Sequence, residues 1–136
     1  MTQTNEDQAK PCPFCRITEE RIVFANELAF VERDRYPLTK GHSLVIPRRH
    51  VRSLFDTSEE ERLALFELLD RTKADIDQEF GPDGYNIGIN DGAPAGQTVM
   101  HLHIHVIPRY LGDTSDPRGG IRWMLPERAA YWKKQR

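Results

Sequence analysis

The sequence has few cysteines, little net charge and no long apolar run, and each shortage narrows the class of protein. No stretch of about 18 apolar residues is present, which argues against a membrane-spanning helix. The net charge is −2, so no overall positive field favours nucleic acid or a membrane surface, and we expect neither as a partner. Residues 1–10 are polar and lack the apolar segment of a secretion signal, so we expect a disordered tail and a cytoplasmic protein.

The composition is that of one ordinary globular domain. The chain has 136 residues, enough to bury a real core, and 38% of them are hydrophobic and 29% charged. No repeat, low-complexity block or internal boundary divides the sequence. We therefore expect one domain over residues 11–110, followed by a C-terminal extension over residues 111–136 that packs on the domain or on a dimer partner.

Short β-prone runs predict a sheet. Residues 22–24 and 28–31 are separated by three residues, which suggests a hairpin. Residues 41–47 form an apolar run that ends at a proline, and residues 86–90 alternate between polar and apolar side chains. Because signals for parallel crossovers are scarce, the sequence predicts an α+β fold: an antiparallel sheet with one long helix and one or more short helices.

The long helix has clear start and stop signals. Ser58 opens a capping box, and a Gly-Pro pair follows residue 80, so we expect a helix over residues 58–80. Leu63, Phe66 and Leu69 fall at helical spacing, and further apolar residues lie on an adjoining stripe. We interpret Leu63, Phe66 and Leu69 as helix packing.

Residues 100–108 carry the most informative pattern, because histidine alternates there with apolar residues. On a strand, His101, His103 and His105 share one face, while the apolar residues between and after them face a core. Neighbouring imidazoles repel once they are protonated, and burying them costs stability. Because this cost must be offset by some use of the three histidines, the row predicts a functional site.

Two uses of the row compete on chemical grounds. Alternate strand residues can share one metal ion, which would make a three-histidine site. Alternatively, one imidazole attacks phosphorus and forms a covalent phosphoramidate, while its other nitrogen donates to an acceptor that fixes the tautomer. The glycine-rich loop over residues 91–97 precedes the row directly and offers donors for phosphate oxygens.

The row resembles a known family. Residues 101–107 match the His-φ-His-φ-His-φ-φ motif of the histidine-triad (HIT) superfamily of nucleotide hydrolases and transferases, where φ is an apolar residue. Residues 41–47 with His50 resemble its second signature, and residues 90–92 and 95–99 resemble the loop before the triad. The chain looks most like bacterial members labelled diadenosine-polyphosphate-hydrolase-like, including the stretch 118–123.

The resemblance implies a role for each histidine near the reaction. His103 would attack the α-phosphorus and carry the nucleotidyl group, with its other nitrogen bound to a main-chain carbonyl that the sequence does not locate. His42 would support this nucleophile. His105, together with Gln97 and Thr98, would contact phosphate oxygens and assist the leaving group.

The resemblance also implies contacts to the nucleotide. Asn90 would position phosphate or ribose, and Gly96 would belong to the phosphate loop. Phe30 and Asp34 lie where the family contacts base and ribose. The implied substrates are dinucleoside polyphosphates or nucleoside phosphoramidates that contain adenine, and the implied assembly is a homodimer that joins two sheets.

Cys12 and Cys15 form a Cys-x-x-Cys pair with three interpretations. It is half of a tetrahedral zinc site, a redox dithiol, or two small buried residues. The redox interpretation requires a preceding strand, which residues 1–10 do not provide. The resemblance implies structural zinc, with His50 and His101 as the remaining ligands.

We thus expect a hydrolase or nucleotidyl transferase that works through a histidine adduct and needs no organic cofactor. Two alternatives stay open at this point. The first is a nucleotide-binding adaptor with little turnover, because a fold does not guarantee a reaction. The second is a metallohydrolase with His101, His103 and His105 on one ion.

Overall fold

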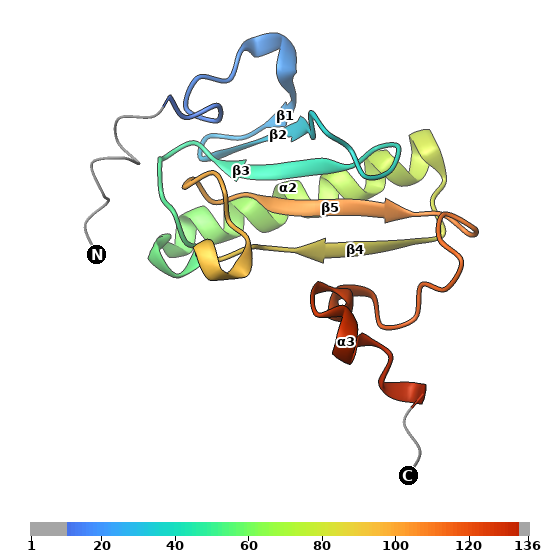
Figure 1. The fold of residues 1–136 in the computed structure, drawn as a ribbon. Coiled ribbons are helices and arrows are strands. Elements are labelled where there is room, and N and C mark those ends of the chain that lie inside the picture. The colour runs from blue at the N-terminus through green and yellow to red at the C-terminus, as the bar shows by residue number, and fades with distance from the viewer. Residues whose placement is uncertain (1–10, 134–136) are drawn as a thin grey trace.

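The structure is a computed structural model that describes residues 11–133, so the tail expected over residues 1–10 lies outside the described residues. The main elements, joined by short 3-10 turns, are β1 (Ile22–Ala25), β2 (Ala29–Arg33), β3 (Ser43–Pro47), α2 (Glu59–Phe80), β4 (Gly84–Gly88), β5 (Ile104–Arg109) and α3 (Pro126–Ala129). The strands form one antiparallel sheet in the order β1-β2-β3-β5-β4, and α2 lies across one face of it (Figure 1). The expected α+β fold is confirmed.

No described helix has the length and apolar character needed to span a bilayer.

The sheet brings together strands that are far apart in the sequence. β1 and β2 form the expected hairpin, and β3 then pairs with β5, so that Leu44 lies opposite His105. β5 begins at Ile104, later than the pattern over residues 100–108 predicts. The reason is that the residues before Ile104 do not pair with β3. The Leu102 amide instead donates to the Val51 carbonyl, in the loop after β3, at 2.7 Å.

The long helix has the predicted limits. The Glu61 amide donates to Ser58 Oγ at 3.1 Å, and the Ser58 amide donates to Glu61 Oε1 at 2.9 Å, which completes the capping box. Gly81 ends the helix in the left-handed region, with φ 59°, where glycine is favoured.

The face that α2 buries differs from the predicted one. Leu63 is 65% exposed and Phe66 is 48% exposed, so for these two residues the interpretation as packing is wrong. Only Leu69 of the three packs against the core, where it is partly buried. The buried stripe recurs every three or four residues and includes Glu61, Leu65, Leu68, Thr72 and Ile76.

Two apolar clusters cover the two faces of the sheet. The larger cluster joins α2 to the sheet and contains Leu102, Ile104 and Val106, as the alternating pattern predicts. The smaller cluster lies on the opposite face, beneath the N-terminal segment, and consists of Phe14, Phe30, Leu44 and Ile46. The histidines at 103 and 105 are half-buried, in alternation with the residues of the larger cluster.

Candidate active site

His103 is held by one hydrogen bond and two ring contacts. Its Nδ1 lies 2.8 Å from the His101 carbonyl oxygen. Because a carbonyl only accepts, Nδ1 carries the proton and Nε2 keeps its lone pair. The ring centroid lies 5.1 Å from that of Phe14 and 5.1 Å from that of His105. This carbonyl is the acceptor that the sequence does not locate.

His42 and His105 form a second pair. His42 Nδ1 accepts a hydrogen bond from the Leu38 amide at 3.1 Å, so the proton of a neutral His42 sits on Nε2. His42 Nε2 lies 3.0 Å from His105 Nδ1. Donation across this contact leaves the proton of His105 on Nε2. His42 therefore touches His105, and its support for His103 passes through that ring.

Burial keeps this pair neutral. Desolvation lowers the pKa of His105 to about 4, with His103 and His42 adding to the effect. Burial also lowers the pKa of His42, although the nearby Asp34 carboxylate opposes the shift. Asp34 Oδ2 lies 3.4 Å from His42 Nε2 and 3.9 Å from His105 Nδ1. At neutral pH, His105 is thus a hydrogen-bond donor with no positive charge.

A cavity of about 490 Å³ opens beside His105. Its polar lining consists of Asp34, His42, Asn86, Asn90 and His105. Its apolar lining consists mainly of Leu38, Ile87, Ile89, Ile107, Ile121 and Met124. Convergent polar groups in a largely apolar cavity are typical of small-molecule sites. The structure brings Asp34, His42, Asn90 and His105 together here.

In the glycine-rich loop, Gly96 and Gln97 already donate hydrogen bonds to main-chain carbonyls. Both amide hydrogens of Gln97 are donated to main-chain carbonyls, those of Arg52 at 3.0 Å and Val99 at 3.1 Å. The Gly96 amide donates to the Ala93 carbonyl at 2.9 Å. Gln97 and Gly96 therefore shape the loop and are not available as phosphate donors in this state, whereas Thr98 is exposed.

Phe30 does not reach the cavity. Its side chain is 1% exposed and lies in the small apolar cluster with Phe14. The sequence resemblance suggests a base contact at this residue, but the structure places it inside the domain. Strand β2 pairs with β3 along its whole length, with Phe30 opposite Ile46, and this pairing keeps the ring on the covered face.

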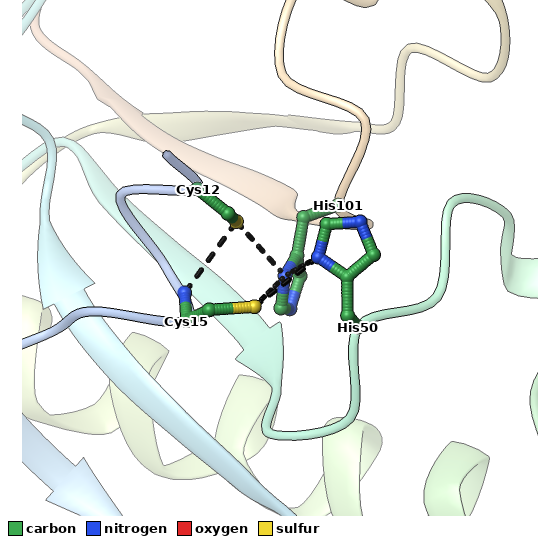
Figure 2. A group of neighbouring side chains, drawn as sticks. All are labelled: Cys12, Cys15, His50 and His101. Carbon is green, nitrogen blue, oxygen red and sulfur yellow. Dashed lines mark hydrogen bonds between the residues drawn. The ribbon is translucent and has the colours of Figure 1, made fainter. Parts of the chain in front are cut away.

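Cys12, Cys15, His50 and His101 converge on one point, as Figure 2 shows. Cys12 Sγ lies 3.3 Å from His101 Nδ1, and Cys15 Sγ lies 3.2 Å from His50 Nδ1. The two Nδ1 atoms are 3.2 Å apart. A tetrahedral zinc ion, with bonds of about 2.0–2.1 Å to nitrogen and about 2.3 Å to sulfur, spaces its ligands by about 3.3–3.8 Å. The predicted ligand set therefore has the spacing that zinc requires.

The tautomer of His101 also suits a metal. Its Nε2 lies 2.7 Å from the Pro47 carbonyl oxygen, so Nε2 carries the proton and Nδ1 presents a lone pair to the cysteines. Burial lowers the pKa of His101 to about 4, which keeps the ring neutral. Burial and the neighbouring Cys12 raise the pKa of the Cys15 thiol to about 11. Without a cation the Cys15 thiol therefore stays protonated, and binding of a metal ion would have to displace its proton.

The row does not converge on a single metal ion. His101 belongs to the cysteine cluster, whereas His105 lies with Asp34 and His42 in a separate group. The metallohydrolase alternative needs all three histidines of the row on one ion, and the described residues show no such arrangement.

Sequence reasoning missed several contributors to the site, among them Phe14 and two residues of the C-terminal extension. Phe14 contacts the rings of both His101 and His103, and its only sequence signal is its place between the two cysteines. Ile121 and Met124 line the cavity from the C-terminal extension, where no periodicity marks them. Figure 1 shows this extension running beside the edge strand β4.

The fold and the arrangement of the histidines are those of a histidine-triad protein. The sequence model of the HIT domain matches residues 16–112, and the chain belongs to this family. A bis(5'-nucleosyl)-tetraphosphatase of Schizosaccharomyces pombe is 44% identical over 96 residues, which cover 71% of this chain and 53% of the relative. Relatives of the chain thus include nucleotide hydrolases.

Two further relatives agree with this assignment. An uncharacterised 16.1 kDa HIT-like protein of Mycoplasma pneumoniae is 37% identical over 114 residues, which cover 81% of this chain and 79% of the relative. The crystal structure of a zinc-bound histidine triad protein from Mycobacterium smegmatis superposes with a TM-score of 0.69 at 35% identity and covers 81% of both chains.

Proposed function

We propose that this chain hydrolyses nucleotides at the α-phosphate through a covalent nucleotidyl adduct on His103. The observation that carries the proposal is the hydrogen bond from His103 Nδ1 to the His101 carbonyl, which leaves Nε2 as a nucleophile. The neighbouring His105 is a neutral donor whose tautomer is set through His42.

In the first step, His103 Nε2 attacks the α-phosphorus and forms a P–N bond. The bond from phosphorus to the bridging oxygen or nitrogen of the leaving group breaks, and its electron pair stays with the leaving group. His105 donates a hydrogen bond from Nε2 to a departing oxygen, which leaves as an anion, whereas a departing nitrogen takes one proton that His105 passes on from solvent, so that His42 keeps its own proton. The exposed Thr98 hydroxyl supplies a donor for a non-bridging oxygen.

In the second step, water attacks the same phosphorus. The P–N bond breaks, and its electron pair returns to Nε2 of His103. One proton of the water is released to solvent, and the His105–His42 pair keeps the tautomers of the resting state for the next cycle. One water is consumed, and a nucleoside monophosphate and the leaving group are the products.

The cavity and the relatives indicate the substrate class. The cavity of about 490 Å³ has apolar walls for a base, and the Asp34 carboxylate is placed to accept ribose hydroxyls. The relative from S. pombe is a dinucleoside tetraphosphatase. We therefore propose dinucleoside polyphosphates or nucleoside phosphoramidates containing adenine as substrates, with Asn90 at the phosphate or ribose.

We further propose that Cys12, Cys15, His50 and His101 hold a zinc ion. Zinc bound by four protein ligands has no open position, so it supplies a structural cross-link and no chemistry. The ligands come from the N-terminal segment, the loop after β3 and the entrance to β5. No organic cofactor is needed by either step.

We also propose a homodimer and limits for the domain. β4 is an edge strand of the sheet, so a second copy can pair there and join two sheets into a homodimer. Residues 11–110 would form the domain and the rest an extension. The cytoplasmic location stays a prediction.

The decisive experiment is intact-mass analysis after mixing the protein with diadenosine tetraphosphate. The wild type should gain an acid-labile adenylyl group, and His103→Ala should gain none and should lose hydrolysis by at least about a thousandfold. Tight binding without adduct or product in the wild type would contradict the proposal and favour a nucleotide-binding adaptor.

A further inference from the structure

We propose that Phe14 is a positioning residue for His103, and that the Cys-x-x-Cys pair around it serves to hold it against that ring. This inference rests on the proposed function of His103 as the nucleophile. The segment that carries Cys12, Phe14 and Cys15 would then take part in the reaction as well as in the zinc site.

The Phe14 ring contacts two histidines at once. Its centroid lies 5.1 Å from that of His103, with the ring planes tilted by 56°, and 5.5 Å from that of His101, with an edge-on angle of 80°. Such distances and angles lie within the favourable range for aromatic pairs. Phe14 is only 6% exposed, so it is a fixed wall.

His103 needs such a wall, because its polar restraint is slight. Among the described residues, the bond to the His101 carbonyl is the only hydrogen bond of its side chain. A single hydrogen bond is readily broken, and a ring that loses it can rotate, which swings Nε2 away from phosphorus and lets the proton move to Nε2. His105 contacts the ring as well, and Phe14 supplies a second aromatic contact. A misplacement of about 1 Å in a reacting group can cost about a hundredfold in rate.

Phe14 is held by what lies below it and beside it. Below are the side chains of Phe30, Leu44 and Ile46 on the sheet. On either side, Cys12 and Cys15 join His50 and His101 in the metal cluster. Without a cross-link, this short segment after residue 10 has only one local main-chain hydrogen bond, from the Arg16 amide to the Cys12 carbonyl at 3.2 Å.

The cluster reaches His103 by a second route as well. His101 gives its side chain to the cluster and its carbonyl to His103 Nδ1. Both the ring contact and the hydrogen bond of the nucleophile are therefore anchored at the same four ligands. The HIT domain match begins at residue 16, so Phe14 and both cysteines lie outside the matched region.

The test compares Phe14→Leu with Phe14→Tyr and with Leu68→Ala. Phe14→Tyr keeps the ring, and Leu68→Ala weakens the apolar cluster on the opposite face of the sheet. We expect Phe14→Leu to slow single-turnover formation of the adenylyl adduct by about 10- to 100-fold, with affinity for AMP within about threefold of wild type. Phe14→Tyr should restore most of the rate, and Leu68→Ala should lower the melting temperature but not the rate.

A nitrogen-15 NMR measurement of the His103 ring gives a readout independent of turnover. The wild type should show one tautomer, protonated at Nδ1, and Phe14→Leu should show a mixture. If Phe14→Leu fails to fold, Phe14→Met replaces it, since methionine fills the volume without a flat ring. The double variant Cys12→Ser/Cys15→Ser should give the same mixture as Phe14→Leu.

The outcomes separate this inference from the proposed function. A wild type that forms no adduct defeats the proposed function, and the NMR comparison still tests the position of the ring. A folded Phe14→Leu with wild-type adduct rate, or with a single wild-type tautomer, overturns the positioning role. An unchanged His103 tautomer in Cys12→Ser/Cys15→Ser overturns the role of the cysteines.

Discussion

At the scale of single residues, the site depends on which ring nitrogen carries a proton. The Leu38 amide donates to Nδ1 of His42, which places the proton of neutral His42 on Nε2. His42 Nε2 in turn donates to Nδ1 of His105, which places the proton of His105 on its Nε2. The His101 carbonyl selects the tautomer of His103. Two main-chain groups, one donor and one acceptor, thus set the tautomers of His105 and His103, the proposed acid and nucleophile, separately.

The neutral state of His105 predicts a loss of stability in acid. Its pKa is about 4 in the folded protein, below the ordinary 6.5, because it is buried and faces His103 and His42, with Asp34 opposing. Between these two pH values the unfolded chain binds the proton and the folded chain does not, so the free energy of unfolding falls as the pH falls from 6.5 to 4. A shift of this size corresponds to about 3 kcal/mol.

Urea denaturation of the wild type and His105→Asn at pH 7, 5.5 and 4 checks this expectation. The variant should lose less stability than the wild type over the same range, by up to about 3 kcal/mol at pH 4. Equal losses in the two proteins would contradict the assignment of the acid sensitivity to His105.

At the scale of elements, patterns in the sequence predict regular structure better than they predict which face is buried. The capping box at Ser58 and the glycine after Phe80 set both ends of α2. Spacing alone does not show which stripe of the helix meets the sheet, and Leu63 and Phe66 lie away from it. The C-terminal extension has no periodicity, so its contribution to the cavity was invisible in the sequence.

That extension should affect nucleotide binding through Met124. This side chain lines the cavity and is 65% exposed, so a carboxylate there is tolerated by the fold but repels substrate phosphates. We expect Met124→Asp to weaken AMP binding about tenfold or more in isothermal titration, with an unchanged melting temperature. Leu125→Asp is the matched control, since Leu125 is 62% exposed and does not line this cavity. Equal effects of both variants would point to general charge repulsion.

At the scale of the whole molecule, motifs that combine several residues predicted more than single residues did. The family resemblance carried by the histidine row implied His50 and His101 as ligands beside the cysteine pair, and these four residues converge in the structure. The row alone did not show that His42 contacts His105, because strand pairing between β3 and β5 decides this contact. Neither did it show that Gln97 donates its amide hydrogens to the main-chain carbonyls of Arg52 and Val99.

Removal of the metal should weaken the whole domain. The four ligands join the N-terminal segment to two loops of the sheet, and a structural zinc site contributes folding free energy directly. We expect metal analysis to find one zinc per chain, and chelation to lower the melting temperature by about 10 °C or more. Cys12→Ser should melt at the lower temperature with or without chelator. Absent zinc, together with freely titrating thiols, would contradict the site.

His101 has a consequence for how such a chain can evolve. The proposed zinc ion would bind its side chain, which only a few residue types can replace, whereas His103 uses its carbonyl, which every residue type provides. A lineage can therefore discard the two cysteines and the first histidine of the row while keeping the nucleophile oriented, provided that packing around residue 14 replaces the lost tether. The metal site is in this sense an accessory that can be gained or lost separately from the chemistry.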